Sequence, residues 1–165
     1  MRRRGVRLLA VGLALLGLGV DQIVKLASVT YLTPGEPVNV IGSLLRLNLI
    51  RNPGAAFGMG ANSTVFFTIF AIVAALACVF VALPRLTKVW HGITLGLLLG
   101  GVLGNLVDRI FQPPAAFHGH VIDMFQLPNF AIFNVADMCI TVAAGIMIIG
   151  SFFGEEEKQP AKAES

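Results

Sequence analysis

Four long apolar stretches, joined by short polar segments, limit what this chain can fold into. Each is close to the ~20 residues that an α-helix needs to cross the ~30 Å hydrocarbon core of a bilayer. With 56% hydrophobic residues, 13% charged residues and a mean hydropathy of +0.81, the composition is typical of membrane proteins. We predict an all-α membrane protein forming one domain over residues 1–153, with four transmembrane helices at about 6–29, 64–83, 90–110 and 131–153.

The basic residues mark one set of helix ends. Arginines precede the first stretch, Arg85 and Lys88 lie between the second and third, and Lys158 and Lys162 follow the fourth. An even number of spans puts these groups on one side, which the positive-inside rule assigns to the cytoplasm. The net charge of +3 therefore reports topology and not nucleic-acid binding. We expect a multi-pass membrane protein with both termini cytoplasmic.

The start of the chain also fits a secretory signal peptide, with basic residues before an apolar run. No clear small-x-small cleavage site follows it, so we expect the first helix to be retained. At the other end, residues 154–165 are charged, contain a proline and lack large apolar residues, which predicts a disordered cytoplasmic tail.

Two segments are expected on the outer side. Residues 45–49, between the first and second helices, alternate apolar and polar side chains. This period predicts a short strand on the outer surface of the membrane, and so a small extracytoplasmic β-rich segment. Residues 111–130, between the third and fourth helices, are expected to form a loop. Its His118 and His120 lack a clear third ligand and are expected to be solvated, so no metal site is predicted.

The strongly polar residues of the apolar segments gather near the outer ends of the helices. A charge at the centre of a membrane helix costs at least about 2.5 kcal/mol, so each needs a partner, a cavity or a substrate. Nothing comparable lies at the bilayer midplane, whereas an ion or proton carrier would stage polar groups across the membrane. A site at the membrane surface is favoured, built from Asp21, Lys25, Asn105, Asp108, Arg109, Asp123, Asn134 and Asp137.

Among these acids, Asp123 and Asp137 are the candidate catalytic pair. Two nearby carboxyl groups in a partly desolvated site can share a proton, and such a dyad activates water for peptide hydrolysis. Spacing alone does not select this pair over Asp108 with either partner. Asp21 and Lys25 lie four residues apart on one helix face and are expected to form a structural ion pair. Asp108 is likewise expected to be scaffold.

Five segments, in this order and spacing, resemble the bacterial lipoprotein signal peptidases, or signal peptidases II. They are Asp21-Gln22-Ile23-Val24-Lys25, Asn52-Pro53-Gly54-Ala55-Ala56-Phe57-Gly58, the run from Gly100 to Arg109, Val121-Ile122-Asp123-Met124-Phe125 and Phe133-Asn134-Val135-Ala136-Asp137. The resemblance implies a membrane aspartic endopeptidase that cleaves diacylglyceryl-modified prolipoproteins just before the lipidated cysteine.

Further expectations follow from this resemblance. Asp123 and Asp137 would be catalytic, and Asp21 with Lys25 a structural pair. Around the substrate and the dyad lie Asn52, Gly101, Asn105, Arg109 and Asn134. No metal or other cofactor is implied, and a monomer in contact with membrane lipid is expected. The alternative is a non-catalytic lipoprotein-binding or assembly factor, for which Asp123→Asn and Asp137→Asn would leave function intact.

Overall fold

The computed structural model describes residues 2–54 and 64–154. The helical span that begins at Thr64 starts as an α-helix and continues through a π-helical stretch and a 3-10 turn to Arg85. Within the described residues, four helices are long and apolar enough to cross a membrane, which confirms the predicted fold class. In chain order the elements are α1 (Arg3–Tyr31), β1 (Val38–Ile41), β2 (Leu45–Asn52), α2 (Thr64–Leu76), α3 (Val89–Phe111), β3 (Val121–Gln126) and α4 (Val135–Gly154).

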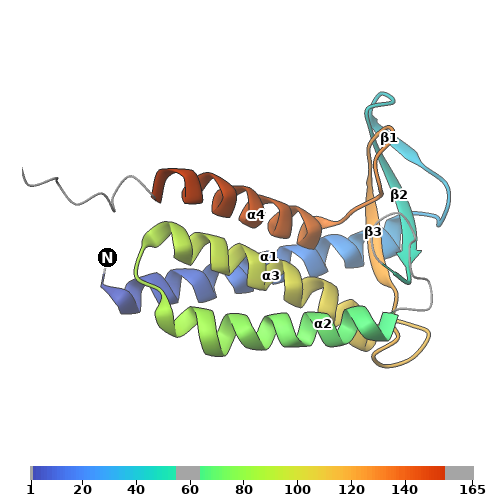
Figure 1. Ribbon diagram of the computed structural model, residues 1–165. Coiled ribbons are helices and arrows are strands. Elements are labelled where there is room, and N and C mark those ends of the chain that lie inside the picture. The colour runs from blue at the N-terminus through green and yellow to red at the C-terminus, as the bar shows by residue number, and fades with distance from the viewer. Residues whose placement is uncertain (1, 55–63, 155–165) are drawn as a thin grey trace, which may run out of the picture.

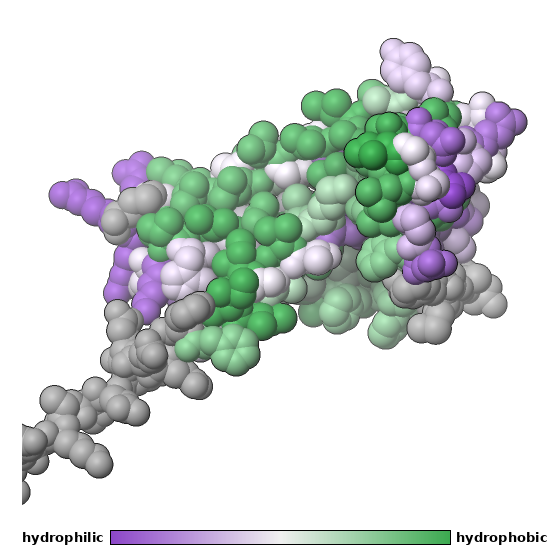
Figure 2. Space-filling view, turned by 90° about the horizontal axis from the view of Figure 1, so that it is seen from above, coloured by the Kyte–Doolittle hydropathy of each residue, from purple (hydrophilic) through white to green (hydrophobic). Residues whose placement is uncertain are grey.

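The helices lie side by side, and the sheet crosses one end of the bundle (Figure 1). The amino-terminal end of α1 and the last turn of α4 both lie at the opposite end from the sheet. Hydrophobic side chains cover the middle of the helical body, and hydrophilic side chains gather toward its two ends (Figure 2). This distribution is that of a bundle whose outer face contacts lipid and whose ends contact water.

Helix α3 is the centre of the bundle. Half of its most apolar window is buried, compared with 22%, 17% and 11% for the other three spans in chain order. Small residues make this position possible, because a Cβ at Gly96 would lie 2.7 Å from the Ala10 carbonyl oxygen of α1. One at Gly104 would lie 2.6 Å from Oδ2 of Asp21. Glycines on α3 therefore allow α1 to approach closely and leave room for a buried acid.

The sheet is antiparallel with strand order β1-β2-β3. A strand at residues 45–49 was predicted, and β2 extends it to Asn52. The expectation of a loop throughout residues 111–130 is wrong, because residues 121–126 form β3. The first four residues of β3 are all buried, so the strand lacks the alternation that marks a half-exposed strand. Its pairing places Asp123 opposite Ile50 of β2.

Helix α4 begins at Val135, four residues later than the predicted start at residue 131. The intervening residues return to the sheet, where Phe133 N–H donates to the Phe125 carbonyl at 3.0 Å and Phe125 N–H donates back at 2.8 Å. The two rings also pack with centroids 5.8 Å apart. These contacts hold the backbone extended up to Asn134, where the helix can start.

Two expectations fall outside the described residues. These are the disordered tail, apart from Gly154, and the part of the second matched segment from Ala55 to Gly58. The extent of the domain over residues 1–153 stays a prediction.

The contact between α3 and α4 yields a stability test at Gly101. A Cβ there would collide with the Ala136 carbonyl oxygen and lie 2.7 Å from Cγ1 of Ile140. Gly101→Ala should therefore push the helices apart and destabilise the fold by about 1–3 kcal/mol. Gly145→Ala on α4 is the matched control, because nothing lies within 4 Å of a Cβ at that position. Thermal unfolding in detergent measures both, and equal midpoints for the two variants would contradict the close contact.

Candidate active site

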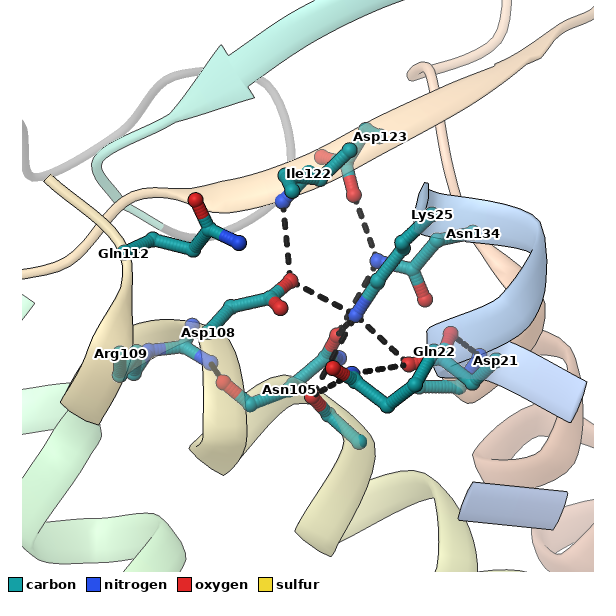
Figure 3. A network of polar contacts seen from close by, with 12 residues as sticks. Asp21, Gln22, Lys25, Asn105, Asp108, Arg109, Gln112, Ile122, Asp123 and Asn134 are labelled. Atoms are coloured by element: carbon teal, nitrogen blue, oxygen red, sulfur yellow. Dashed lines mark hydrogen bonds and ion pairs between the residues drawn. The ribbon is translucent and has the colours of Figure 1, made fainter. Parts of the chain in front are cut away.

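A buried ion cluster joins α1 to α3 at the sheet end of the bundle (Figure 3). The Lys25 ammonium lies 2.8 Å from Oδ2 of Asp21 and 2.7 Å from Oδ2 of Asp108. Lys25 is only 2% exposed, and both acids are fully buried. Charges this deep are tolerated only when they are paired and hydrogen-bonded. The expected Asp21–Lys25 pair is therefore present, with Asp108 as a third member.

The two acids of this cluster each hold another part of the backbone. Oδ1 of Asp21 accepts the Ala136 N–H at 2.8 Å, at the amino-terminal end of α4, where helix N–H groups lack partners. Oδ2 of Asp108 accepts the Ile122 N–H at 3.0 Å, on β3. The cluster thus fixes the positions of both segments that carry the candidate catalytic acids.

Asn134 and Asp137 form a reciprocal cap at the start of α4. The Asn134 side-chain oxygen accepts the Asp137 N–H at 2.9 Å, and Oδ2 of Asp137 accepts the Asn134 N–H at 3.2 Å. This is a capping box, with Asp in the place usually held by Glu or Gln. Asp137 therefore sits in the first turn of the helix with a fixed orientation.

Asp123 is held by two asparagines. Asn134 Nδ2 donates to its Oδ1 at 2.6 Å, and Asn52 Nδ2 donates to its Oδ2 at 3.0 Å. Asn105 performs the same role for the other acid, because its Nδ2 donates to Oδ1 of Asp137 at 2.8 Å. Each oxygen of both acids accepts a hydrogen bond, and the side chains of three asparagines supply three of the four donors.

Both acids line one cavity of about 610 Å³ at the end of the bundle. Its polar side chains are those of Asp123, Asp137, Asn52, Asn105, Arg109 and Thr141. The rest of the wall is largely apolar and comes from α4 and the segment that precedes it, including Leu127, Phe130, Ile132, Met138, Ile140 and Val142. The cavity therefore offers a small polar end next to a long apolar surface.

The cavity environment changes the proton affinity of Asp123. Burial, together with the nearby Asp137 charge, raises the pKa of this carboxyl from 3.8 to about 7, against the lowering effects of Asn52, Asn134 and Lys25. An aspartate with a pKa near 7 exchanges a proton readily at neutral pH.

The structure brings most of the predicted site residues together. Gly101 does not line the cavity; it lies against Ala136, so it acts on the spacing between α3 and α4. Arg109 lines the cavity, donates to the Asn105 carbonyl oxygen at 3.2 Å and lies 6.0 Å from the Phe67 ring centre.

Two contributors to the site were not predicted from the sequence, the Ile122 N–H and the Gln22 side chain, which donates to Asp21. The Ile122 contact is made by the backbone, so it carries no residue signature in a sequence.

Two acids in one cavity at the end of a bundle of membrane spans are features of a membrane-embedded aspartic peptidase. The pattern of the signal peptidase (SPase) II family matches residues 13–153, and the chain belongs to this family. The resemblance noted in the sequence is thereby confirmed.

Relatives agree with this assignment. The lipoprotein signal peptidase of Streptomyces coelicolor is 43% identical over 159 residues, covering 93% of this chain and 76% of the relative. That of Mycobacterium leprae is 38% identical, covering 92% and 74%. The chain spans 64% of the lipoprotein signal peptidase of Mycolicibacterium smegmatis, at 39% identity.

Solved structures show the same arrangement. A bacterial membrane enzyme determined by the in meso method at 2.3 Å resolution superposes with a TM-score of 0.82 and 26% identity, covering 94% of each chain. A second one, at 1.9 Å resolution, gives 0.74 and 28% identity over 86% of this chain and 90% of the other. The protein is a multi-pass membrane peptidase.

The raised pKa of Asp123 predicts a pH-dependent stability difference. The folded state binds this proton more tightly than the unfolded chain, so the free energy of unfolding falls as pH rises between about 4 and about 7. Asp123→Asn removes this penalty. At pH 8 its free energy of unfolding in detergent should exceed that of the wild type by on the order of a few kcal/mol at most, which appears as a higher thermal midpoint, and the difference between the midpoints should narrow toward pH 4.

The control is Asp21→Asn, the same substitution at a buried acid. Asp21 is paired with Lys25, so this variant should be less stable than the wild type at both pH values. A wild type whose midpoint equals that of Asp123→Asn at pH 8 would contradict the assignment for Asp123.

Proposed function

We propose that this chain removes the signal peptide from diacylglyceryl-modified prolipoproteins by cleaving just before the lipidated cysteine, with Asp123 and Asp137 as its catalytic dyad. One observation carries the proposal. Both carboxyl groups line the same cavity and accept hydrogen bonds from amides, and within residues 2–54 and 64–154 neither has a salt-bridge partner. The acids Asp21 and Asp108, by contrast, are neutralised by Lys25.

The chemistry needs one proton shared by the dyad. The ionised carboxylate takes a proton from a water molecule, whose oxygen attacks the scissile carbonyl carbon, while the protonated partner donates its proton to the carbonyl oxygen. The tetrahedral intermediate then collapses: its C–N bond breaks as one carboxyl gives its proton to the leaving amine, and the other carboxylate takes the proton of a hydroxyl group of the intermediate, which restores the singly protonated dyad. No acyl-enzyme forms, and no cofactor takes part.

The surrounding asparagines act by orientation in this proposal. Asn52 and Asn134 hold both oxygens of Asp123, and Asn105 holds one oxygen of Asp137. Arg109 has one hydrogen bond to a backbone carbonyl and faces the cavity. Its guanidinium has five N–H donors, so several remain to bind substrate carbonyl oxygens.

The cavity suits a substrate that is partly in lipid. Its apolar wall runs along α4, through Met138, Ile140 and Val142, and continues from the polar end that holds the acids. The apolar part of a signal peptide can lie against this wall while the acyl chains of the modified cysteine keep the scissile bond near the membrane surface.

The proposed function also implies how the protein is oriented in the membrane. The sheet end, which carries the site, faces the outside of the bacterial cytoplasmic (inner) membrane, and both termini are cytoplasmic, in accord with the basic residues at the opposite end. We propose a monomer surrounded by lipid, because both acids and the three asparagines that hold them come from one chain.

Cleavage of a purified diacylglyceryl-modified prolipoprotein by the full chain in detergent tests the function. The wild type should cut before the modified cysteine and should leave the unlipidated precursor intact. Asp137→Asn and Asp123→Asn should each lower the rate by at least about 10³-fold, since neither variant can run the two proton transfers. The Asp21→Asn variant controls for general effects of neutralising a buried acid.

The binding-factor alternative makes the opposite prediction. If Asp123→Asn and Asp137→Asn bind and process precursor as the wild type does, the dyad assignment is lost. If the wild type fails to cut where a signal peptidase II of known activity succeeds, the enzymatic function itself is lost.

Two asparagines of β2, Asn52 and Asn48, test whether Asn52 orients Asp123. Asn52→Ala removes a donor that stabilises the ionised form of Asp123, so the pKa of Asp123 should rise further. The descending limb of the pH–rate profile should then move to higher pH, with a loss in kcat of about 10–10²-fold. Asn48→Ala is the control, because Asn48 donates to Gln126 and not to an acid. Equal profiles for the two variants would contradict the role of Asn52.

A further inference from the structure

The Lys25 ammonium has a contact that the ion cluster does not require. Besides Asp21 and Asp108, it donates to Oδ1 of Asn105 at 3.2 Å and approaches the Gly104 carbonyl oxygen at 3.4 Å. Figure 3 shows Lys25 at the meeting point of these groups, between the carboxylates and the asparagines. Lys25 therefore connects the buried ion cluster to the side chains that hold the dyad.

This contact decides which way the Asn105 amide points. Oδ1 of Asn105 accepts from Lys25 and, at 3.0 Å, from Nδ2 of Asn134. A flipped amide would turn its NH₂ group toward an ammonium that has no acceptor capacity. With Oδ1 held by Lys25, Nδ2 of Asn105 must face Asp137, to which it donates at 2.8 Å.

The orientation of the Asn105 amide also determines that of the Asn134 amide. Because the Oδ1 of Asn105 is an acceptor, Asn134 presents Nδ2 to it, and the same Nδ2 donates to Oδ1 of Asp123 at 2.6 Å. The Asp137 N–H, which donates to Oδ1 of Asn134, favours the same orientation. Both amides therefore present N–H donors to the acids, in one consistent direction starting at Lys25.

We propose that Lys25 is a positioning residue for the hydrolysis: its ammonium sets the direction of the Asn105–Asn134 amide chain so that both aspartates receive N–H donors. This inference rests on the proposed function of Asp123 and Asp137 as the dyad. It goes beyond a structural ion pair, because a structural pair acts on stability alone, whereas a residue that orients the donors also changes the protonation behaviour of the dyad.

The charges around Asp123 set the direction of the expected pH change. Asp137 of α4 faces it, as do Lys25 of α1 and Arg109 of α3, and Asp108 of α3 holds the adjacent Ile122 N–H. On β2, Arg51 is exposed and donates to Gln112. Lys25→Met keeps most of the apolar stem and removes the ammonium. The ionised dyad then loses a positive charge and an enforced donor, so the pKa of Asp123 rises and the pH–rate profile moves to higher pH.

The experiment compares pH–rate profiles for cleavage of the lipidated precursor by Lys25→Met, Asn105→Ala and the double variant, in the full chain in detergent. Each single variant should lower kcat about 10²-fold, leave KM within about threefold and move the profile up by about one pH unit. The double variant should resemble either single variant, because both remove the same chain of hydrogen bonds.

Arg7→Met is the matched control on the same helix. Arg7 lies near the opposite end of α1 and donates to the Pro84 carbonyl oxygen, so its loss should leave the profile in place. A profile for Lys25→Met that does not move, with activity lowered evenly at every pH, would overturn the proposal, and so would additive effects of Lys25→Met and Asn105→Ala.

A charge-balanced variant keeps the proposal testable if Lys25→Met alone fails to fold. Lys25→Met with Asp108→Asn removes one charge of each sign. Asp108 is the acid to neutralise because its Oδ1 has no hydrogen-bond partner among the described residues, whereas Asp21 keeps Gln22 and Ala136. Its profile should still move upward, and an unmoved profile overturns the inference. A wild type that cleaves and an Asp137→Asn variant that does not would leave the proposed function standing in that case.

Discussion

Most of the polar contacts at the site depend on one buried ammonium group. Lys25 is paired with two fully buried carboxylates, and these in turn hold the backbone of β3 and the first turn of α4. Removing one partner of such a pair leaves an uncompensated charge in a medium of low dielectric, at a cost of about 3–5 kcal/mol. The other polar groups of the site take their positions from this cluster, because each buried donor or acceptor must find a partner nearby.

The close helix contacts and the polar site depend on each other. Glycines along α3 bring α1 near enough for Asp21 to reach the start of α4, and a side chain at Gly104 would occupy the space of the Asp21 carboxylate. In a membrane, where lipid is as apolar as the helix surfaces, close packing and interhelical hydrogen bonds replace the hydrophobic effect as the forces that join helices. Assembly of the bundle therefore depends on the small residues and the buried acids together.

Much of this organisation could be predicted from the sequence. Span length and hydropathy predict the four helices because the bilayer imposes a fixed thickness, and the cost of burying charge predicts that Asp21 and Lys25 would pair. The resemblance of the five segments selected Asp123 and Asp137 from among the acids, which their spacing alone did not do. The fold class and the family are confirmed, while the roles of the individual site residues stay proposals.

The remainder depended on tertiary contacts. Strand β3 has no alternating pattern because its first four residues are buried, and the start of α4 moved to Val135 because Phe133 pairs with Phe125. The amide orientations follow from which donors meet which acceptors in space, and no sequence spacing encodes that. One further consequence concerns Asn134, which both begins a helix and holds an acid. Helix initiation and the assembly of the dyad are thus a single cooperative event, so a ligand that binds the dyad should also suppress fraying at the amino-terminal end of α4.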